Sequence, residues 1–380
     1  MNRAWRLVAL LSLTATASYL CRVNTSVAGV QIMREFGLSQ QAMGRIFSAF
    51  LAGYALCQIP GGVLADRFGA VRVLAWAALA WVVAIVWMAG PGTGVVSLLA
   101  ARFVLGVAEA PTFPASAQAI SRWLPAGARG RANGAVIAAV GLGSAIAPPL
   151  VTYFMTRFGW RVALLVSAAP AMAAGLAWFA VPAPVHQRKE AARRDPIPVS
   201  RSFALLILSY TAQGYVGYIF VFWFYLYLVD VRHFDLLRGA LFGALPWLLS
   251  IVSIPLGGAL YDRLGARRKL APMVGLGGSG ILIAAGAHTG TAWVAAVCLA
   301  LATALVMSVE GPFWAAMTGM SGGRTGTAGG IMNMGTNVGG FISPALTPVL
   351  AAWMGWEAAL LVSAAVAIVA GLLWLGIDVV

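Results

Sequence analysis

Residues 61–72 read GGVLADRFGAVR and residues 257–268 read GGALYDRLGARR, so one segment returns 196 residues later with eight of twelve positions identical. The same offset relates later pairs: Gly159-Trp160 with Gly355-Trp356, and Pro148 with Pro344. A constant offset over separate stretches indicates two homologous halves. Because both halves are strongly apolar, the pattern favours a membrane transporter built from repeats, with its site between them.

The composition excludes an ordinary soluble protein. The chain is 61% hydrophobic and 9% charged, whereas a soluble domain has about 25% charged residues. A membrane-crossing helix needs roughly 20 apolar residues, and we predict twelve such spans. They are residues 5–33, 40–65, 71–90, 93–122, 131–156, 160–182, 200–229, 238–262, 270–288, 291–320, 324–352 and 356–378. We therefore expect an all-α membrane protein of two pseudo-symmetric six-helix bundles, residues 1–182 and 200–380, joined by a cytoplasmic linker at 183–199.

The distribution of the basic residues, which give the net charge of +14, indicates how the chain is oriented in the membrane. With the N-terminus in the cytoplasm, 17 of the 25 basic residues fall on the cytoplasmic side, and the positive-inside rule then places both termini there. We therefore expect no nucleic-acid partner, and the basic linker is a candidate contact for anionic membrane lipid. The high arginine usage, with only two lysines, suggests a bacterial genome and hence the cytoplasmic (inner) membrane. The first span contains Arg22 and is too long for a cleavable signal peptide, so it is expected to be a retained helix.

The repeated segment carries more polar detail than a simple loop needs. Gly61 and Gly62 allow close helix packing, and Gly69 supplies a tight turn. Asp66 falls at the end of the second span, where the helix dipole disfavours a negative charge. A basic group must balance it, and Arg67, Arg72 and the basic loop 129–131 are the candidates.

The pattern G-x-L-x-D-R-x-G-x-x-R, present in both halves, resembles the signature of the major facilitator superfamily. The twelve-span, two-half layout agrees with this resemblance over the whole chain. It implies that the segment is a conformational latch, whose aspartate pairs with basic groups on neighbouring helix ends. The gating residues expected from it are Asp66, Arg67, Arg72, Asp262 and Arg263.

Four ionisable residues lie deep within predicted spans, where charges are costly and usually functional. They are Arg22, Arg102, Glu109 and Glu310. Arg22 lies about 17 residues into the first span and Arg102 about nine into the fourth. Glu109 follows Arg102 by seven residues, which is two helical turns and therefore the same face. Two guanidinium groups in one cavity need an anion or a carboxylate between them, and arginine binds carboxylates with two parallel bonds. The alternative is a structural ion pair between Arg22 and Glu109.

Other polar residues are candidates for the same cavity. Glu310 lies deep in the tenth span, as a second proton site or as a packing partner. Tyr19 and Tyr215 are related by the 196-residue offset, and Tyr218 lies one turn further on. The eleventh span adds two amides. The predicted substrate-binding set is Arg22, Tyr19, Tyr215, Tyr218, Asn333 and Asn337.

The segments around the buried charges resemble one branch of that superfamily more closely. Helix 1 reads SYLCRVNTSVA from Ser18, and helix 4 reads RFVLGVAEAPTFP from Arg102. Both look like the organic-anion symporters, which include bacterial hexuronate and galactonate permeases and sialin. The resemblance implies that Arg22 binds the substrate carboxylate, that Glu109 carries the proton and that Arg102 tunes it. Many bacterial members have aspartate where this chain has Cys21, so we expect fewer protons per substrate or a different mode of coupling.

The expected function is proton-coupled symport of a small organic anion by alternating access, by a monomer without cofactor or metal. An organophosphate exchanger is the first alternative, but the seventh span lacks the arginine that the related branches use. A drug or metabolite exporter is the second, and the glycine-proline segment Gly141–Pro149 matches its usual signature only in part. A non-transporting receptor and an enzyme are less favoured, because the sequence shows neither a sensor domain nor a nucleophile–base pair or metal-ligand cluster.

Overall fold

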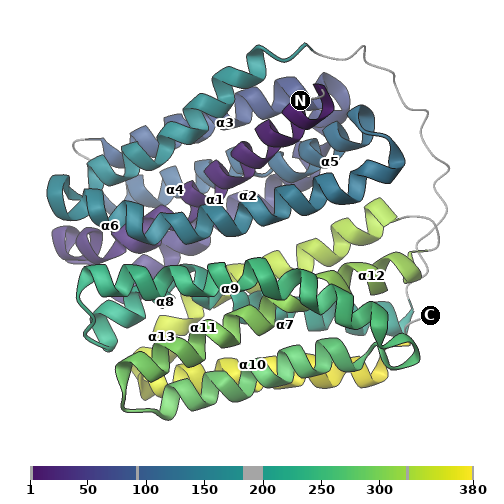
Figure 1. Cartoon of the computed structure of the whole chain (residues 1–380). Coiled ribbons are helices and arrows are strands. Elements are labelled where there is room, and N and C mark those ends of the chain that lie inside the picture. The colour runs from purple at the N-terminus through teal and green to yellow at the C-terminus, as the bar shows by residue number, and fades with distance from the viewer. Residues whose placement is uncertain (1–2, 91–93, 183–199, 322–324, 379–380) are drawn as a thin grey trace. The chain divides into compact units, whose positions relative to one another are not determined.

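The computed structural model describes residues 3–90, 94–182, 200–321 and 325–378 (Figure 1). In these residues every regular element is a helix. The predicted linker at 183–199 lies outside the described residues. The chain divides into two compact units, Met1–Ser39 with Ala49–Ala192 and Gln40–Ser48 with Arg193–Val380.

The first unit is built on six helices. They are α1 (Arg3–Phe36), α2 (Gln40–Phe68, whose first residues group with the second unit), α3 (Ala70–Ala89), α4 (Val95–Glu109), α5 (Thr112–Trp123) and α6 (Ala126–Phe179). Its core lies where α1, α3, α5 and α6 meet around Leu11, Leu74 and Trp178, all of them fully buried. The Trp178 indole donates a hydrogen bond to Thr14 Oγ1 at 2.9 Å, which satisfies a polar atom inside this core.

The second unit repeats the plan with more interruptions. Its elements are α7 (Arg201–Phe222), α8 (Phe224–Leu226), a π-helical turn (Tyr227–Val231), α9 (Leu236–Arg263), a 3₁₀ turn (Gly265–Arg267), α10 (Leu270–His288), α11 (Ala292–Ser308), α12 (Glu310–Met320), α13 (Thr325–Leu373) and a final 3₁₀ turn (Trp374–Gly376). Its core gathers Tyr210, Phe313 and Trp374, and the rings of Phe313 and Trp374 lie 5.1 Å apart.

Backbone conformations repeat with the sequence. Gly69 and Gly265, 196 residues apart, have φ of 85° and 51°, and Gly159 and Gly355 have φ of 81° and 85°. Positive φ is readily reached by glycine alone, and glycine occupies the corresponding positive-φ position in both halves. These paired turns support the duplication that the sequence predicts.

In the part of the chain that the structure describes, ten helices are long and apolar enough to cross a membrane. Two of them, the apolar stretches Arg131–Phe179 and Ala328–Gly376, have 49 residues each. At 1.5 Å per residue each stretch would be more than twice as long as a bilayer core about 30 Å thick. Gly159 and Gly355 interrupt the helical backbone within them, so each consists of two joined helices. The prediction of an all-helical membrane fold is confirmed, whereas the count of twelve crossings stays a prediction.

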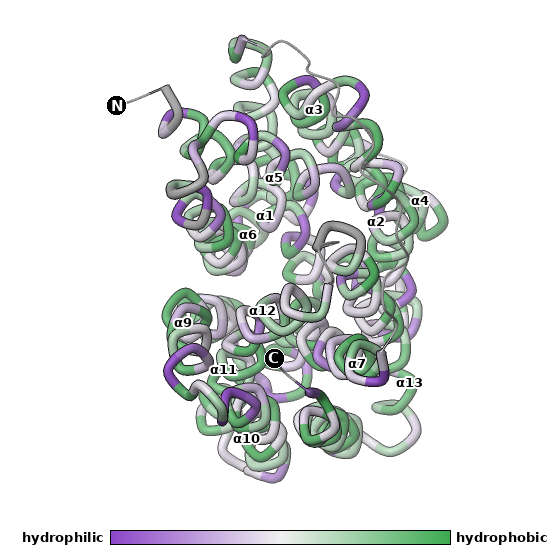
Figure 2. The backbone as a smooth tube through the Cα atoms, turned by 90° about the vertical axis from the view of Figure 1, so that its right-hand side faces the viewer, coloured by the Kyte–Doolittle hydropathy of each residue, from purple (hydrophilic) through white to green (hydrophobic). Residues whose placement is uncertain are grey.

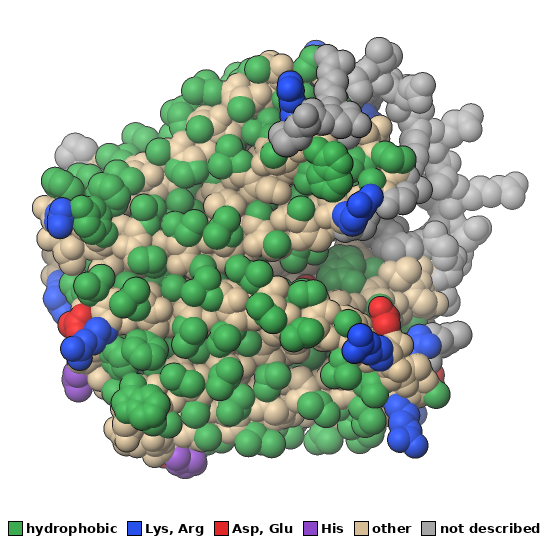
Figure 3. Space-filling model, viewed as in Figure 1, with side chains coloured by type: hydrophobic (Ala, Val, Ile, Leu, Met, Phe, Trp, Pro, Cys, Tyr) green, Lys and Arg blue, Asp and Glu red, His purple; other side chains and the backbone are tan. Residues whose placement is uncertain are grey.

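The surface is apolar along the helices. Figure 2 shows hydrophobic colours along most of each helix, and in Figure 3 apolar side chains cover the helix flanks while charged ones gather near helix ends. Trp76, Val83 and Ile281 are 64%, 67% and 66% exposed. Apolar patches of this extent on a folded protein mark contact with a partner or a membrane, and lipid is the environment that the helix lengths indicate.

Two spans are interrupted at the acidic residues. The span Val95–Trp123 breaks between Glu109 and Thr112, and the span Ala292–Met320 breaks at Val309, just before Glu310. Proline explains both breaks, because Pro111 and Pro312 lack the N–H that would bond to the carbonyl four residues earlier. In both units the first glycine of the duplicated segment packs at the break: Gly61 lies against Pro111, and Gly257 against the carbonyl of Ser308.

This packing gives a matched pair of variants. A Cβ at Gly61 would lie 2.8 Å from Pro111 Cα, whereas one at Gly62 would lie 3.7 Å from its nearest neighbour, an ordinary contact. Gly61→Ala is therefore expected to destabilise the protein by about 1–3 kcal/mol through overpacking, and Gly62→Ala to leave it nearly unchanged. Thermal unfolding of the purified protein in detergent measures both. Equal unfolding temperatures for the two variants would contradict the close packing.

Candidate functional site

Three buried ionisable side chains form the polar centre of the first unit. Arg22 on α1, and Arg102 and Glu109 on α4, are at most 1% exposed. Arg22 Nη2 lies 3.1 Å from Glu109 Oε2 and donates a hydrogen bond to it. Arg102 Nη1 donates to Thr25 Oγ1 on α1 at 3.4 Å. The structure thus brings together three of the four charges that the sequence singled out.

Aromatic rings surround the guanidinium of Arg22. Its central carbon lies 4.5 Å from the ring centre of Tyr19, 4.8 Å from that of Phe50 and 4.7 Å from that of Tyr54. The central carbon of Arg102 lies 4.8 Å from the same Phe50 ring. Cation–π attraction of this kind holds a cation without neutralising it. The aromatic rings therefore leave the charge of both guanidinium groups in place.

Glycine contacts between α2 and α4 place these rings. A Cβ on Gly53 would collide with the carbonyl oxygen of Phe103, and one on Gly106 with that of Phe50. The two helices can approach closely because each presents a glycine to the backbone of the other. This approach brings Phe50 and Tyr54 beside the charges of α4.

The charge balance of this cluster is positive. Two guanidinium groups face one carboxylate, and Glu109 Oε1 has no hydrogen-bond partner within the described part of the chain. Arginine keeps its proton, so the cluster carries one excess positive charge, or two when Glu109 is protonated. A buried excess of this sign is costly unless an anion joins it.

Sequence reasoning missed four residues of this cluster. Ser18 Oγ donates to Glu109 Oε2 at 3.0 Å, one helical turn before Arg22, and Thr25, Phe50 and Tyr54 make the contacts described above. The spacing of Ser18 and Thr25 from Arg22 on the same helix was the available signal. Nothing in the sequence of the second span separates Phe50 and Tyr54 from ordinary apolar packing residues.

Cys21, the neighbour of Arg22 on α1, hydrogen-bonds to α6. Its thiol donates to the carbonyl of Ser167 on α6 at 3.7 Å, and Asn24 donates to Ser167 Oγ at 2.7 Å. The side chain is fully buried. It thus packs as a small residue between α1 and α6, as free cysteine usually does.

The residues predicted to bind substrate in the second unit lie on α7 and α13. Tyr215 and Asn337 are buried, at 8% and 1% exposure. Tyr218 is half-buried and stacks on Phe222, with ring centres 5.9 Å apart. Asn333 is also half-buried. Their roles as ligands stay predictions, as does the role of Tyr19, which accepts a hydrogen bond from Arg22 Nη1 at 3.3 Å.

Glu310 lies in a different setting from Glu109. It is the first residue of α12, and it accepts hydrogen bonds from Tyr210 and from the indole of Trp314. The positions that correspond to Arg22, Arg102 and Glu109 in the second half are Tyr218, Cys298 and Leu305. The charge cluster is therefore not duplicated, and Glu310 has an environment of its own.

The predicted gating residues lie at helix ends. Asp66 accepts a hydrogen bond from Gln118 Nε2 on α5 at 2.6 Å, and no ion pair joins it to a basic side chain that the structure describes. The guanidinium of Arg67 lies 5.3 Å from the ring centre of Phe68. Arg72, Asp262 and Arg263 are exposed. In the basic loop, Arg129 donates to the carbonyls of Ser121 and Leu124, which end α5.

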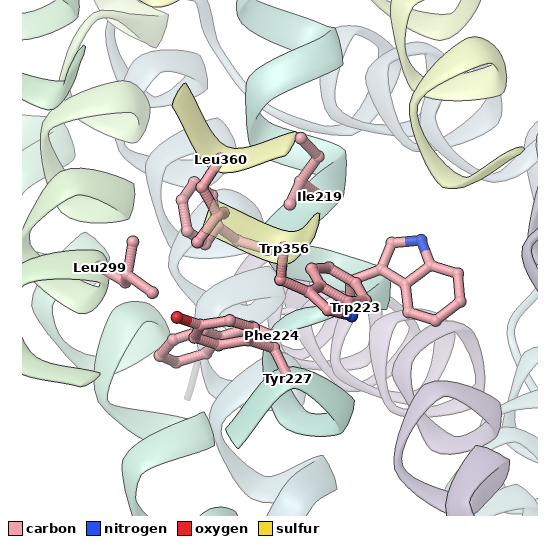
Figure 4. A pocket seen from close by; sticks show the side chains of 8 residues that line it. Ile219, Trp223, Phe224, Tyr227, Leu299, Trp356 and Leu360 are labelled. Atoms are coloured by element: carbon pink, nitrogen blue, oxygen red, sulfur yellow. The ribbon is translucent and has the colours of Figure 1, made fainter. Parts of the chain in front are cut away.

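A small pocket in the second unit is apolar (Figure 4). Trp223, Phe224, Tyr227 and Trp356 turn toward one another there, and the ring of Trp356 lies 5.7 Å from those of both Trp223 and Tyr227. None of its lining side chains is charged. This pocket therefore does not suit a small anion.

Comparison with known proteins yields a family match over most of the chain. The sequence profile of the Major Facilitator Superfamily matches residues 11–344. A probable sulfoacetate transporter of Cupriavidus necator is 35% identical over 355 residues, covering 86% of this chain and 82% of that protein. A hexuronate transporter of Bacillus subtilis is 28% identical, over 89% of this chain and 85% of that one. A D-galactonate transporter of Escherichia coli is 26% identical, over 98% and 94%.

The same fold occurs in solved structures. A bacterial homologue of the human lysosomal transporter Spinster superimposes with a TM-score of 0.85, covering 99% of this chain and 97% of that one. Its sequence is 17% identical to this one. The likeness shows the fold, and the curated relatives are transporters of organic anions.

Proposed function

The chain belongs to the major facilitator superfamily, and from this we propose that it carries a small organic anion across the membrane together with protons. The observation that carries the proposal is the buried Arg22–Glu109–Arg102 cluster of the first unit. It combines an excess of positive charge with one carboxyl group that can take up a proton. The predicted symport by alternating access fits this chemistry.

The substrate class follows from the cations. Arg22 presents a planar fork of donors that matches a carboxylate or a sulfonate, and one of its nitrogens is held by a single carboxylate oxygen, Glu109 Oε2. The curated relatives are transporters of sulfoacetate, hexuronates and D-galactonate. Each of these anions carries a carboxylate, which we take as the group that Arg22 binds.

Proton coupling follows from the competition for Arg22. When Glu109 is ionised, its carboxylate holds the guanidinium at 3.1 Å. When Glu109 is protonated, its charge is lost and the attraction weakens, so the guanidinium can turn to the substrate carboxylate. Binding of a proton together with a singly charged anion also keeps the net charge of the cluster constant, which lowers the cost of holding both inside a membrane.

The setting of the transporter is also a proposal. The excess of arginine on one side of the predicted spans supports an orientation with both termini in the cytoplasm. The bacterial relatives support a bacterial cytoplasmic membrane. We take the single chain as the working unit, because all residues of the charge cluster come from one unit of one chain.

Uptake into proteoliposomes tests the proposal. A panel of labelled sulfoacetate, glucuronate, D-galactonate, glutamate and a sugar phosphate is offered with and without an inward proton gradient. We expect uptake of at least one carboxylate, faster with the gradient and slowed by a protonophore. Protein-free liposomes are the control. Transport of the sugar phosphate alone, or exchange that ignores the gradient, would contradict the symporter and favour an antiporter.

A further inference from the structure

A second acidic side chain lies inside the second unit among neutral hydrogen-bond donors. Glu310 Oε1 accepts from the hydroxyl of Tyr210 on α7 and, at 3.3 Å, from the indole of Trp314 one turn along α12. Glu310 Oε2 accepts from Gln213 Nε2 on α7 at 3.5 Å. Tyr210 and Gln213 are 2% and 3% exposed, so these donors belong to the interior of the unit.

Among the described residues no cation balances this carboxyl group. Within the described residues no lysine, arginine or histidine lies within ion-pairing distance of it. The helices that pack against α12 are α7, α9, α10, α11 and α13. Of their titratable groups Tyr210 donates a hydrogen bond to the carboxyl, and α7 also carries Tyr218. The others are Arg201 and Tyr215 on α7, Arg238, Tyr261, Asp262 and Arg263 on α9, His288 on α10, Cys298 on α11 and Glu357 on α13.

The charged groups among them are paired elsewhere or lie at helix ends. His288 Nδ1 lies 2.7 Å from Glu357 Oε1, so these two pair with each other. Arg238 pairs with Asp235 at 3.2 Å, and Asp262 and Arg263 are exposed at the end of α9. Glu310 itself is half-buried and Trp314 is 39% exposed, so the carboxyl lies at the edge of the interior. A carboxylate that is partly withdrawn from water and has no cation beside it still costs free energy. Uptake of a proton removes that cost, so Glu310 is placed to exchange protons.

The hydrogen bonds around Glu310 fit both of its protonation states. Thr336 Oγ1 on α13 donates to Gln213 Oε1 at 3.4 Å, and Gln213 Nε2 donates to Glu310. A protonated Glu310 needs an acceptor. A flip of the Gln213 side-chain amide by about 180° supplies this acceptor, because Gln213 Oε1 then faces Glu310 and accepts its proton. In the flipped state Gln213 Nε2 donates to Thr336 Oγ1. The flip breaks the 3.4 Å hydrogen bond from Gln213 Nε2 to the Val306 carbonyl. The two hydrogen bonds that link Glu310, Gln213 and Thr336 can therefore reverse their direction.

We propose that Glu310, with Tyr210, Gln213 and Trp314 as its donors, is a second proton-exchanging site of the chain, located in the second unit and independent of the Arg22–Glu109 cluster. It goes beyond the anion site proposed above, because no cation and no substrate contact is involved. A carrier with two such carboxyl groups, Glu109 and Glu310, can move up to two protons for each anion.

Infrared difference spectroscopy of the full-length protein in lipid tests the site without any substrate. The spectrum is recorded between alkaline and acidic pH, and the C=O band of protonated carboxyl groups is followed. Glu310→Gln is expected to remove one component of that band and Glu109→Gln a different one. Tyr210→Phe, which keeps the ring and removes one donor, is expected to move the pH at which the Glu310 component appears.

The control is Glu35→Gln. Glu35 pairs with Arg161 at 2.7 Å and is 41% exposed, so its removal is expected to leave the buried components unchanged. A Glu310→Gln spectrum identical to wild type over the physiological pH range would overturn the proposal. The proposal would also be overturned if Glu310→Gln removes a component whose appearance pH is the same in Tyr210→Phe as in wild type. The carboxyl would then titrate outside this hydrogen-bonded site. Failure of anion uptake would leave these outcomes unaffected.

Discussion

Replacing Arg22 by alanine is expected to abolish binding of the transported anion. Arg22 is 1% exposed and supplies the guanidinium at the centre of the charge cluster. Truncating one partner of a buried, hydrogen-bonded charge pair costs about 2–5 kcal/mol, a loss of roughly 30-fold to several thousand-fold in affinity. Arg22→Lys keeps the positive charge but loses the planar guanidinium that binds a carboxylate with two hydrogen bonds. We therefore expect this variant also to lose most of the affinity for the anion. Titration calorimetry with the anion identified by uptake measures both variants.

Two controls separate binding from folding. Arg161→Ala removes a half-exposed arginine that pairs with Glu35, and it should bind normally. Arg22→Ala also leaves Glu109 without its cation, which itself destabilises a buried site. The double variant Arg22→Ala/Glu109→Gln removes that charge and should restore thermal stability without restoring binding. Normal affinity in a folded Arg22→Ala protein would remove Arg22 from the site.

Much of the fold could be predicted from the sequence because the decisive signals are local. Apolar length alone identifies membrane spans, and the repeated segment at 61–72 and 257–268 identifies the two halves. The paired positive-φ turns at Gly159 and Gly355 follow from the same offset. The interruptions beside Glu109 and Glu310 were not predicted, although Pro111 and Pro312 were visible in the sequence, because a proline in a membrane helix can be accommodated without a break.

The candidate site was predictable in its charges and not in its surroundings. Charged residues are so unusual in apolar spans that Arg22, Arg102 and Glu109 stand out individually. Their contacts depend on how α1, α2 and α4 meet. Arg102 and Glu109 share a face of α4, yet Arg102 donates to Thr25 whereas Arg22 bonds to Glu109.

The aromatic neighbours show the same limit of sequence reasoning. Phe50 contacts both guanidinium groups, but an aromatic residue in an apolar helix has no distinguishing local pattern. The clue lay in the small residues Gly53 and Gly106, whose meaning as a helix contact emerges only when both helices are placed. The close packing of α2 against α4 therefore determines which aromatic residues belong to the site, and this packing cannot be read from either span alone.

Glu109→Gln is expected to separate exchange from net uptake. The amide is neutral at every pH, so it imitates the protonated carboxyl and leaves Arg22 permanently available to the anion. Substrate binding and the exchange of labelled for unlabelled anion across the membrane should therefore persist at close to the wild-type rate. The proton can no longer be taken up or released at this position, so stimulation of uptake by an inward proton gradient should disappear.

Proteoliposomes loaded with unlabelled anion measure the exchange, and empty ones under a proton gradient measure net uptake. Glu35→Gln serves as the matched control, because it also removes a carboxylate from the first unit. Glu35 lies at the C-terminal end of α1 and pairs with Arg161. It should retain both activities. If gradient-driven uptake survives in Glu109→Gln, the coupling proton binds elsewhere, and the carboxyl of Glu310 becomes the group to remove next. If exchange is lost together with net uptake, the ion pair of Arg22 and Glu109 is needed to form the binding site itself, and the two residues act as structure rather than as a proton switch.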